Sequence, residues 1–241
     1  MKALIIRPQP GADATAQRFS AAGHSPLVMP LFEIQPVAPT SISTSGYDAI
    51  ILTSGNAVRA AVPFLKANAH MPIYAVGSAT ARAAEKSAVT PFRTGSSGIE
   101  ALVAVAVEDG HKRLLWLAGE DHSPLPARLG VTVDTHIVYK SVAVQTPDDF
   151  TAAVVQSDLV ILHSSRAAQH FAACCDAAGI SRHKIALATF SEAIARNTGD
   201  GWSICIVAPA PNDAALLKAI QTHYTNHQTD IIACNNPEGT T

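Results

Sequence analysis

The chain contains the same pattern of strand, polar turn and helix twice, about a hundred residues apart. The first copy, Asp48–Ala84, holds two apolar strands that each run into a turn of small polar residues and then an alanine-rich helix. The second copy has strands that begin at Asp158 and Ile185, with the same order of segments. Strands that alternate with helices form parallel sheets covered by helices. The repeat therefore predicts two α/β units of one kind.

The order of the other segments predicts that one unit is inserted into the other. Residues 2–29 read as strand, helix and strand, and residues 148–223 continue this alternation. Between them, Leu31–Val37 and Tyr139–Val144 alternate like strands and could pair with each other. We expect two doubly wound parallel-sheet domains that face each other across a cleft and are joined by a two-stranded β-ladder. Domain one is discontinuous (residues 1–34 plus 143–225), domain two is inserted (residues 37–138), and residues 226–241 form a disordered tail.

Local signals predict the bounds of several helices. Asn56–Asn68 reads as one helix, and the last helix of the chain reads as Asn212–His223. Ser97 and Glu100 have the spacing of a capping box that opens a helix ending at Val107. Only a short helix fits in residues 125–129.

Composition excludes several classes of protein. Apolar residues make up 48% of the chain and charged residues 15%, which favours sheets buried on both faces over disorder. No apolar run is long enough to cross a bilayer, and the apolar start of the chain is too short for a signal peptide. The net charge is −2, and no cluster of Lys and Arg indicates a nucleic-acid partner. We expect a cytoplasmic monomer with reduced cysteines that interacts with neither membranes nor nucleic acids.

Small polar residues follow the expected strands, at the edge where parallel α/β sheets bind ligands. Several of them open helices, whose free N–H groups favour anions. The alternative is that these Ser and Thr side chains only cap their helices. Arg7 after the first strand either pairs a carboxylate or braces the turn. The candidate binding residues are Arg7, Ser54, Gly77, Ser78, Thr80, Gly119, Ser164, Ser165 and Ser191.

The ordered set of these segments resembles the uroporphyrinogen-III synthase family, which acts in tetrapyrrole and heme biosynthesis. No single segment is specific, but together they cover roughly residues 2–222 in the right order. The matching segments are Ile6–Pro8, Asp48–Ser54, Ala75–Thr80, Leu115–Gly119, Val138–Tyr139, Val160–Ser164, Ser191–Glu192 and Ala208–Leu217. The segment Thr189–Glu192 departs from the family's usual Gly-x-x-Thr turn, so a threonine role does not transfer to it directly.

The resemblance implies a cyclising hydro-lyase that uses no cofactor and no metal. Its substrate is the linear tetrapyrrole hydroxymethylbilane, which loses water and closes with inversion of ring D. A transient hand-over from the enzyme that makes hydroxymethylbilane is a further expectation. Because this substrate expels water unaided and then closes without inversion, the main task of the protein is to position it.

Tyr139 matches the family's tyrosine in the returning linker and is the candidate catalytic residue. A phenol is protonated at pH 7 and can assist departure of a hydroxyl as a weak general acid. The alternative is an amphipathic ring packed at a hinge.

Other readings of the sequence are weaker. A two-lobed, non-catalytic sensor of an anionic metabolite is the main alternative. A nucleotide-using enzyme is the third option and is weaker, because no phosphate-binding glycine motif follows any strand of this chain. His223 and His227 have the spacing of a metal pair but lie near the chain end without enough further ligands. The cluster Glu120–His122 reads as a solvated loop, and Cys174–Cys175 as part of a helix core.

Overall fold

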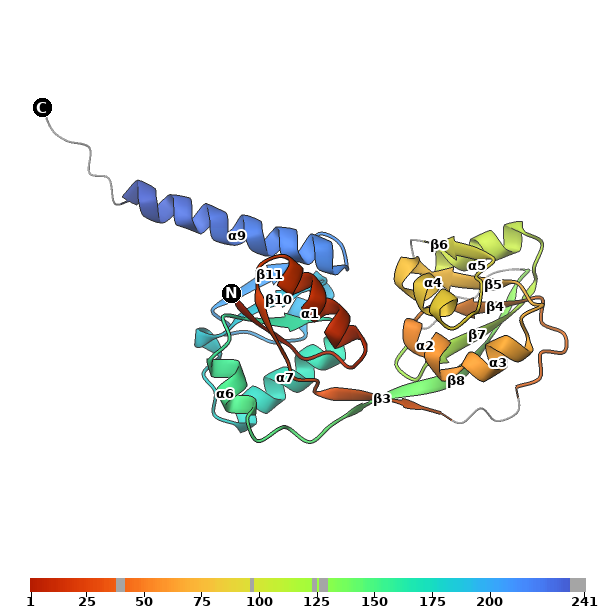
Figure 1. Cartoon of the computed structure of the whole chain (residues 1–241), viewed down its shortest axis with the longest axis horizontal. Helices are drawn as coiled ribbons and strands as arrows, with labels where there is room; N and C mark the ends of the chain where they lie inside the picture. Colours follow the sequence, from red (N-terminus) through yellow and green to blue (C-terminus); the bar gives the residue numbers. More distant parts are fainter. Residues whose placement is uncertain (38–41, 96–97, 123–124, 126–129, 235–241) are drawn as a thin grey trace, which may run out of the picture. The chain divides into compact units, whose positions relative to one another are not determined.

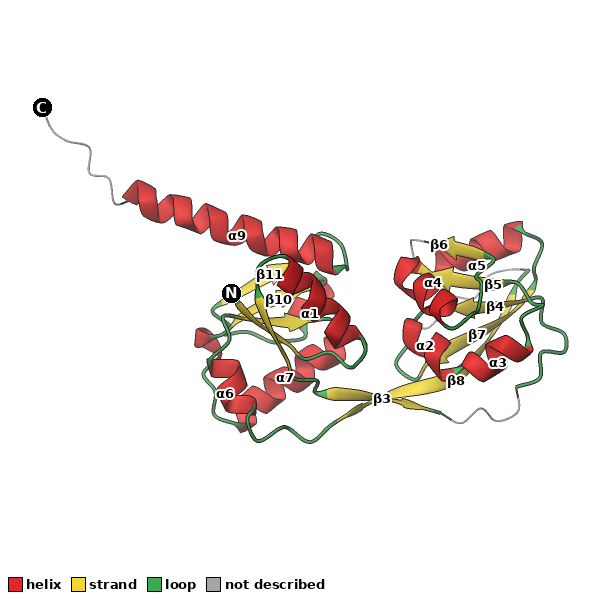
Figure 2. Cartoon of the chain, in the orientation of Figure 1, coloured by secondary structure: helices red, strands yellow, loops and turns green. Residues whose placement is uncertain are grey.

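A computed structural model describes residues 1–37, 42–95, 98–122, 125 and 130–234. The chain divides into two compact units (Figure 1). Unit 1 comprises Met1–Glu33 and Ala143–Thr241, and unit 2 comprises Ile34–Val142. Each combines one sheet with helices on its faces, as Figure 2 shows. The predicted mixed α/β fold with two parallel sheets is confirmed.

The sheet of unit 1 has five strands in the order β11-β10-β9-β1-β2. All of its pairs are parallel, with β1 next to β2 and to β9. The strands are β1 (Lys2–Ile5), β2 (Ser25–Val28), β9 (Leu159–Leu162), β10 (Ala186–Thr189) and β11 (Ile204–Val207).

Both faces of this sheet are buried, because successive strand residues point to opposite sides. Ala3 and Ile5 pack with α1 (Gly11–Ala21) and α9 (Asp213–Cys234). Leu4 and Ile6 pack with the helices of the other face. Figure 1 shows α1 and α9 on one side of this unit and α6 and α7 on the other. The elements that complete the unit are α6 (Phe150–Val155), α7 (Ser165–Ala177), α8 (Glu192–Arg196) and a short 3-10 helix (Arg182–Lys184).

The sheet of unit 2 has six strands in the order β3-β8-β7-β4-β5-β6. The pairs among β4, β5, β6, β7 and β8 are parallel. The strands are β3 (Phe32–Pro36), β4 (Ala49–Leu52), β5 (Ile73–Val76), β6 (Arg93–Gly95), β7 (Arg113–Gly119) and β8 (Thr132–Ala143). The sequence analysis did not predict β6, which is short, polar and exposed at two of its three residues.

The two faces of the unit 2 sheet are covered by different helices. Ile50 and Leu52 pack with α2 (Gly55–Ala60), α3 (Val62–Ala67) and α4 (Gly77–Lys86). Ala49 and Ile51 pack with α5 (Ile99–Glu108). The central strands β4 and β7 are therefore buried on both sides, which explains their continuous apolar sequence.

Two predicted helices differ from the observed ones. The single helix expected over Asn56–Asn68 is wrong, because the chain forms α2 and α3 with a break at Ala61. Pro63 lacks the N–H that a continuous helix needs at that position and is tolerated only in the first turn of a new helix. The last helix, expected to end at His223, continues to Cys234.

Some sequence predictions fall where the structure describes nothing. Ser97 of the predicted capping box, most of the short helix predicted at 125–129, and residues 235–241 of the predicted tail lie outside the described residues. Within the described part of the chain, no helix is long and apolar enough to cross a membrane.

Candidate functional site

The strand order of unit 2 predicts a candidate ligand-binding edge of its sheet. In chain order its parallel strands run 3-2-1-4-5 across the sheet, so the order reverses between β4 and β7. Open α/β sheets bind ligands beyond the carboxyl ends of the two strands at such a reversal. At this edge β4 leads into Thr53 and Ser54, and β7 ends at Gly119. Two of the residues predicted to bind substrate thus lie at the expected position.

A β-bulge brings Tyr139 to the same edge. Ala118 pairs with Ile137, but the next residue, Gly119, pairs with Tyr139, so β8 has one extra residue, Val138, at this point. Bulges redirect side chains. Val138 and Tyr139 consequently pack on one face of the sheet, while Ile137 packs on the other.

Gly119 provides the space that the Tyr139 ring occupies. A Cβ atom at Gly119 would lie 2.4 Å from Cζ of Tyr139 and 2.7 Å from its hydroxyl oxygen. Those separations are shorter than any real contact, so no larger residue fits while the ring keeps its place. Gly119, predicted as a binding residue, therefore lies directly under the predicted catalytic residue.

Ser54 is the hydrogen-bond partner of Tyr139. The Tyr139 hydroxyl donates to Oγ of Ser54 at 3.2 Å, and the same Oγ accepts from the backbone N–H of Asn56 at 3.1 Å, capping α2. A serine hydroxyl has one proton and two acceptor lone pairs. Both lone pairs accept hydrogen bonds here, so towards a ligand the Ser54 hydroxyl can act only as a donor. The capping alternative is thus observed, and the cap leaves the hydroxyl able to donate.

Arg59 lies beside this pair, and the sequence analysis missed it. It is exposed, and its guanidinium turns back over the start of α2, where it donates to Oδ1 of Asn56 and lies 3.2 Å from the position of a Cβ at Gly55. Partial burial of the guanidinium lowers its pKa, and the nearby Tyr139 opposes that shift. Only the i, i+3 spacing from Asn56 on a helix pointed to this arrangement.

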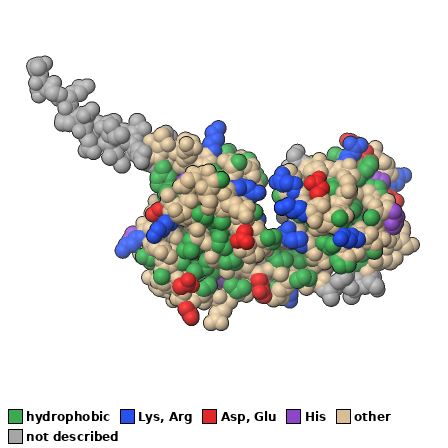
Figure 3. Space-filling model, in the orientation of Figure 1, with side chains coloured by type: hydrophobic (Ala, Val, Ile, Leu, Met, Phe, Trp, Pro, Cys, Tyr) green, Lys and Arg blue, Asp and Glu red, His purple; other side chains and the backbone are tan. Residues whose placement is uncertain are grey.

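Basic side chains concentrate on the helices that flank this edge. Figure 3 shows Lys and Arg side chains gathered over α2 and α4 on the visible face of unit 2. The basic residues of these helices are Arg59, Arg82 and Lys86. Such a surface attracts carboxylates, although the net charge of the whole chain is −2.

The predicted residues at the start of α4 differ in exposure. Gly77 has φ of 76°, a left-handed conformation that favours glycine, and it begins the helix. Ser78 is exposed, whereas Thr80 is only 4% exposed and packs into the interior. The α4 helix contacts α2, because Ala83 lies against Gly55.

Unit 1 has its own reversal of strand order, between β1 and β9. Its strands run 2-1-3-4-5 in chain order across the sheet. Arg7 follows β1, and His163 and Ser164 follow β9. This edge therefore holds two predicted binding residues, Arg7 and Ser164, together with a histidine that the sequence analysis did not select.

The serines of unit 1 cap helices. Oγ of Ser164 accepts from the backbone N–H of Ala167 at 3.2 Å, and Oγ of Ser191 accepts from that of Ile194 at 3.4 Å. Ser165 is the first residue of α7. The hydroxyls of Ser164 and Ser191 accept these bonds through a lone pair, so, as at Ser54, capping does not use the hydroxyl proton.

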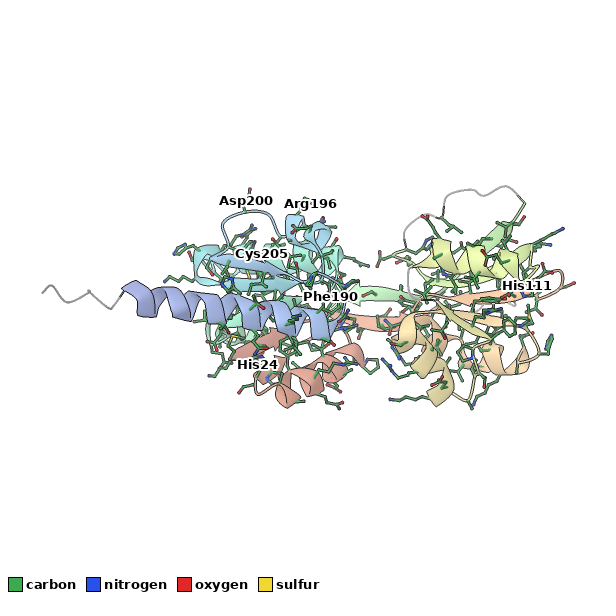
Figure 4. The ribbon with its side chains drawn as sticks, turned by 90° about the horizontal axis from the view of Figure 1, so that it is seen from above. His24, His111, Phe190, Arg196, Asp200 and Cys205 are labelled. Carbon is green, nitrogen blue, oxygen red and sulfur yellow. The ribbon has the colours of Figure 1, made fainter. Side chains whose placement is uncertain are left out.

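A buried polar cluster lies behind the carboxyl edge of unit 1. Thr15 on α1 is 0% exposed and Asp213 at the start of α9 is 6% exposed, and the Thr15 hydroxyl donates to both Asp213 oxygens at 3.3 and 3.2 Å. Nε2 of His163 lies 3.4 Å from the Thr15 hydroxyl and 3.5 Å from Oδ1 of Asp213. The ring of Phe190, labelled in Figure 4, packs edge-on against His163 with ring centroids 4.5 Å apart.

The electrostatics of this cluster keep His163 neutral. Burial lowers the pKa of its imidazole to about 4, with the Arg7 guanidinium adding to that shift and Asp213 opposing it. Burial pulls the pKa of Asp213 upward, but hydrogen bonds and charge from His163 and Arg18 leave it below its usual range. Because His163 is neutral at pH 7, the charge that stabilises the Asp213 carboxylate at that pH comes from Arg18, its ion-pair partner.

The remaining candidate residues have simpler surroundings. Cys174 and Cys175 are buried, as predicted. Glu120, Asp121 and His122 are exposed, and the His122 ring packs edge-on against Trp116. Among the residues that the structure describes, no group of three or more His, Cys, Asp or Glu side chains is arranged to hold a metal ion.

A family model and several solved structures match this chain. The model of the family described as uroporphyrinogen-III synthase HemD matches residues 13–218. The crystal structure of a mutant uroporphyrinogen III synthase from Thermus thermophilus is 15% identical, with 95% of this chain and 99% of that chain covered and a TM-score of 0.52. The wild-type structure from the same organism is 16% identical, covering 93% and 99% of the two chains, with a TM-score of 0.43. No curated protein sequence matches at a significant level.

Proposed function

We propose a mechanism from the premise that the chain belongs to the uroporphyrinogen-III synthase family, whose model matches most of its length. As a member, it is a cyclising hydro-lyase of tetrapyrrole biosynthesis that converts hydroxymethylbilane to uroporphyrinogen III. We assign the loss of water to the carboxyl edge of unit 2, because that edge combines Tyr139, Ser54 and Arg59. The observation that carries this assignment is the hydrogen bond from Tyr139 to Ser54 at the reversal of strand order.

In this mechanism Tyr139 is the proton donor. When substrate binds, its terminal hydroxyl takes the place of Ser54 as acceptor of the Tyr139 proton. The carbon–oxygen bond breaks, the hydroxyl leaves as water with that proton, and the pyrrole nitrogen supplies the electron pair that forms an azafulvenium cation. A pyrrole carbon at the other end of the substrate then bonds to the cationic carbon, and the phenolate takes the proton which that pyrrole loses as it becomes aromatic again. The Arg59 guanidinium stabilises the phenolate while it exists.

Binding and positioning account for the remaining residues. The substrate carries carboxylates, and the two sheet edges offer backbone N–H groups at helix starts, serine protons and the cations Arg7 and Arg59. The predicted binding residues Gly77, Ser78, Ser164, Ser165 and Ser191 act in this way, while buried Thr80 supports the start of α4 from within. Gly119 acts by making room for Tyr139. The conformation in which the bound substrate is held then decides whether the macrocycle closes with or without inversion of ring D.

The lifetime of the substrate suggests how it arrives. Hydroxymethylbilane loses water unaided and closes without inversion, so a short path from the enzyme that makes it protects the product isomer. We propose that the enzyme that makes hydroxymethylbilane hands it over directly and transiently to this protein in the cytoplasm. Neither a membrane nor a nucleic acid takes part in this transfer. Adding a chemical trap for free hydroxymethylbilane to a coupled reaction tests this step, because complete interception of the flux would contradict direct transfer.

Tyr139→Phe tests the mechanism. Turnover should fall about a hundredfold at most, the low end of what a general acid contributes, because the substrate also loses water unaided. The assay incubates the protein with enzymatically generated hydroxymethylbilane, oxidises the products and resolves porphyrin isomers I and III. Wild-type protein that produces isomer I alone would refute the activity, whereas a fully active Tyr139→Phe variant would refute only the role of Tyr139.

A further inference from the structure

Arg7 occupies a defined position at the carboxyl edge of unit 1. It follows β1 at the reversal of strand order, and its guanidinium lies over Gly11, the first residue of α1. A Cβ atom at Gly11 would be 2.6 Å from Nε of Arg7 and 2.8 Å from Cζ. The guanidinium is therefore packed against the backbone of α1 and is not a freely moving surface cation.

A buried hydroxyl connects Arg7 to a buried carboxylate. The Arg7 guanidinium donates to Oγ1 of Thr15 at 3.4 Å, and the Thr15 hydroxyl in turn donates to Asp213 at 3.2 and 3.3 Å. The hydroxyl thus accepts from the cation and donates to the anion, the only direction in which all three groups are satisfied. The turn after β1, helix α1 and helix α9 therefore each contribute one residue to this chain of hydrogen bonds. Thr15 and Asp213 are 198 positions apart in the sequence.

A cluster of this kind needs a reason, because burying polar groups costs stability unless they are fully paired. Thr15 is 0% exposed, and the structure shows no hydrogen-bond partner for the buried Nδ1 of His163. An apolar interior at these positions would be the simpler way to join α1, β9 and α9.

We propose that Thr15 and Asp213 are positioning residues that fix the Arg7 guanidinium to bind a carboxylate of the substrate. The assignment rests on the function proposed above, since it takes the ligand to be a linear tetrapyrrole with carboxylate side chains. Arg7 contacts substrate, Thr15 orients Arg7, and Asp213 orients Thr15 while balancing positive charge in the cluster. Preorganised cations bind carboxylates better than mobile ones, because less rotamer entropy is lost on binding.

Two substitutions disturb Arg7 by different routes. Thr15→Val keeps the shape of the side chain but removes the hydroxyl that orients Arg7, and Thr15→Ser restores it. Gly11→Ala places a methyl group where the guanidinium lies and leaves Thr15 and Asp213 intact. Both Thr15→Val and Gly11→Ala should raise KM about tenfold, equivalent to 1.4 kcal/mol, with kcat changed less than twofold. Thr15→Ser should retain the KM of the wild type.

Stability and double substitution separate this role from a structural one. Thr15→Val should lower the midpoint of urea unfolding, whereas Gly11→Ala should not, because alanine favours helix. Arg18→Gln is the matched control: it removes another partner of Asp213 and should leave KM unchanged. In an Arg7→Met background, Thr15→Val should raise KM no further.

The outcomes decide between the possibilities. A normal KM in both Thr15→Val and Gly11→Ala would overturn the inference, and so would an undiminished effect of Thr15→Val in the Arg7→Met background. Isomer III made by the wild type in the same experiments shows that the proposed function stands even then. Isomer I alone from the wild type would instead be the failure of the proposed function.

Discussion

Gly119→Ala is the substitution that most directly tests the geometry of the unit 2 edge. A Cβ atom there would lie 2.4 Å from Cζ of Tyr139, 2.7 Å from its hydroxyl oxygen and 2.9 Å from Cε1, whereas ordinary contacts begin at 3.4 Å. The ring must therefore move by about 1 Å, the difference between 3.4 and 2.4 Å. The hydrogen bond from the ring's hydroxyl to Ser54 is already 3.2 Å long, so a displacement of that size disturbs it.

The cost follows from the same displacement. Inserting a methyl group into a packed region costs about 1–3 kcal/mol of unfolding free energy, and misplacing a reacting group by 1 Å can cost about a hundredfold in rate. We expect Gly119→Ala to lower kcat by about ten- to a hundredfold. The initial rate of isomer III formation measures the loss of kcat, and urea unfolding measures the loss of unfolding free energy.

Tyr139→Ala supplies the control, because it removes the ring that the new methyl group would strike. In that background Gly119→Ala should cost less than about 0.5 kcal/mol, within the range of additive, independent changes. The reasoning would be refuted if Gly119→Ala kept the wild-type rate. It would also be refuted if the loss of stability were the same with and without the Tyr139 ring.

Two further predictions concern charge. Arg59→Gln should raise KM several-fold, and more at low than at high salt, because salt screens a contact with a carboxylate. The control Lys66→Gln on α3 should leave KM unchanged; equal effects of the two substitutions would show that only the overall positive charge of the surface matters. Burial lowers the folded-state pKa of His163 to about 4 from 6.5, so the unfolded chain binds this proton first and stability is lost as pH falls from about 6.5 to about 4. Over that pH range the loss of unfolding free energy is about 3 kcal/mol. In urea unfolding, the stability of His163→Gln should depend less on pH than that of the wild type; an unchanged pH dependence would contradict the burial of a neutral imidazole.

Much of the fold could be predicted from local sequence. Apolar runs such as Ala49–Leu52 and Leu159–Leu162 are strands, and the serines that follow them begin helices. The errors have local causes as well. Pro63 divides a segment whose apolar spacing suits one helix, and β6 is too polar and too short to read as a strand. Neither error affects the strands that carry the candidate site.

The site itself could be predicted only in part. Tyr139, Ser54 and Gly119 were selected separately, from a family resemblance and from their places at strand ends, and they lie together. Arg59 was missed because its importance depends on how its side chain turns back over α2. His163 and Asp213 were missed because each is an ordinary residue in its own segment.

The sequence alone determined the alternation of strands and helices, and with it two parallel sheets with candidate binding residues at their carboxyl edges, because periodicity and capping act within a few residues. Only the tertiary structure decided which residues share those edges. One extra residue in β8 turns Tyr139 toward Ser54, 85 positions earlier, and α9 brings Asp213 back to Thr15. Strand register and helix packing set such contacts, and neither leaves a local signal in the chain.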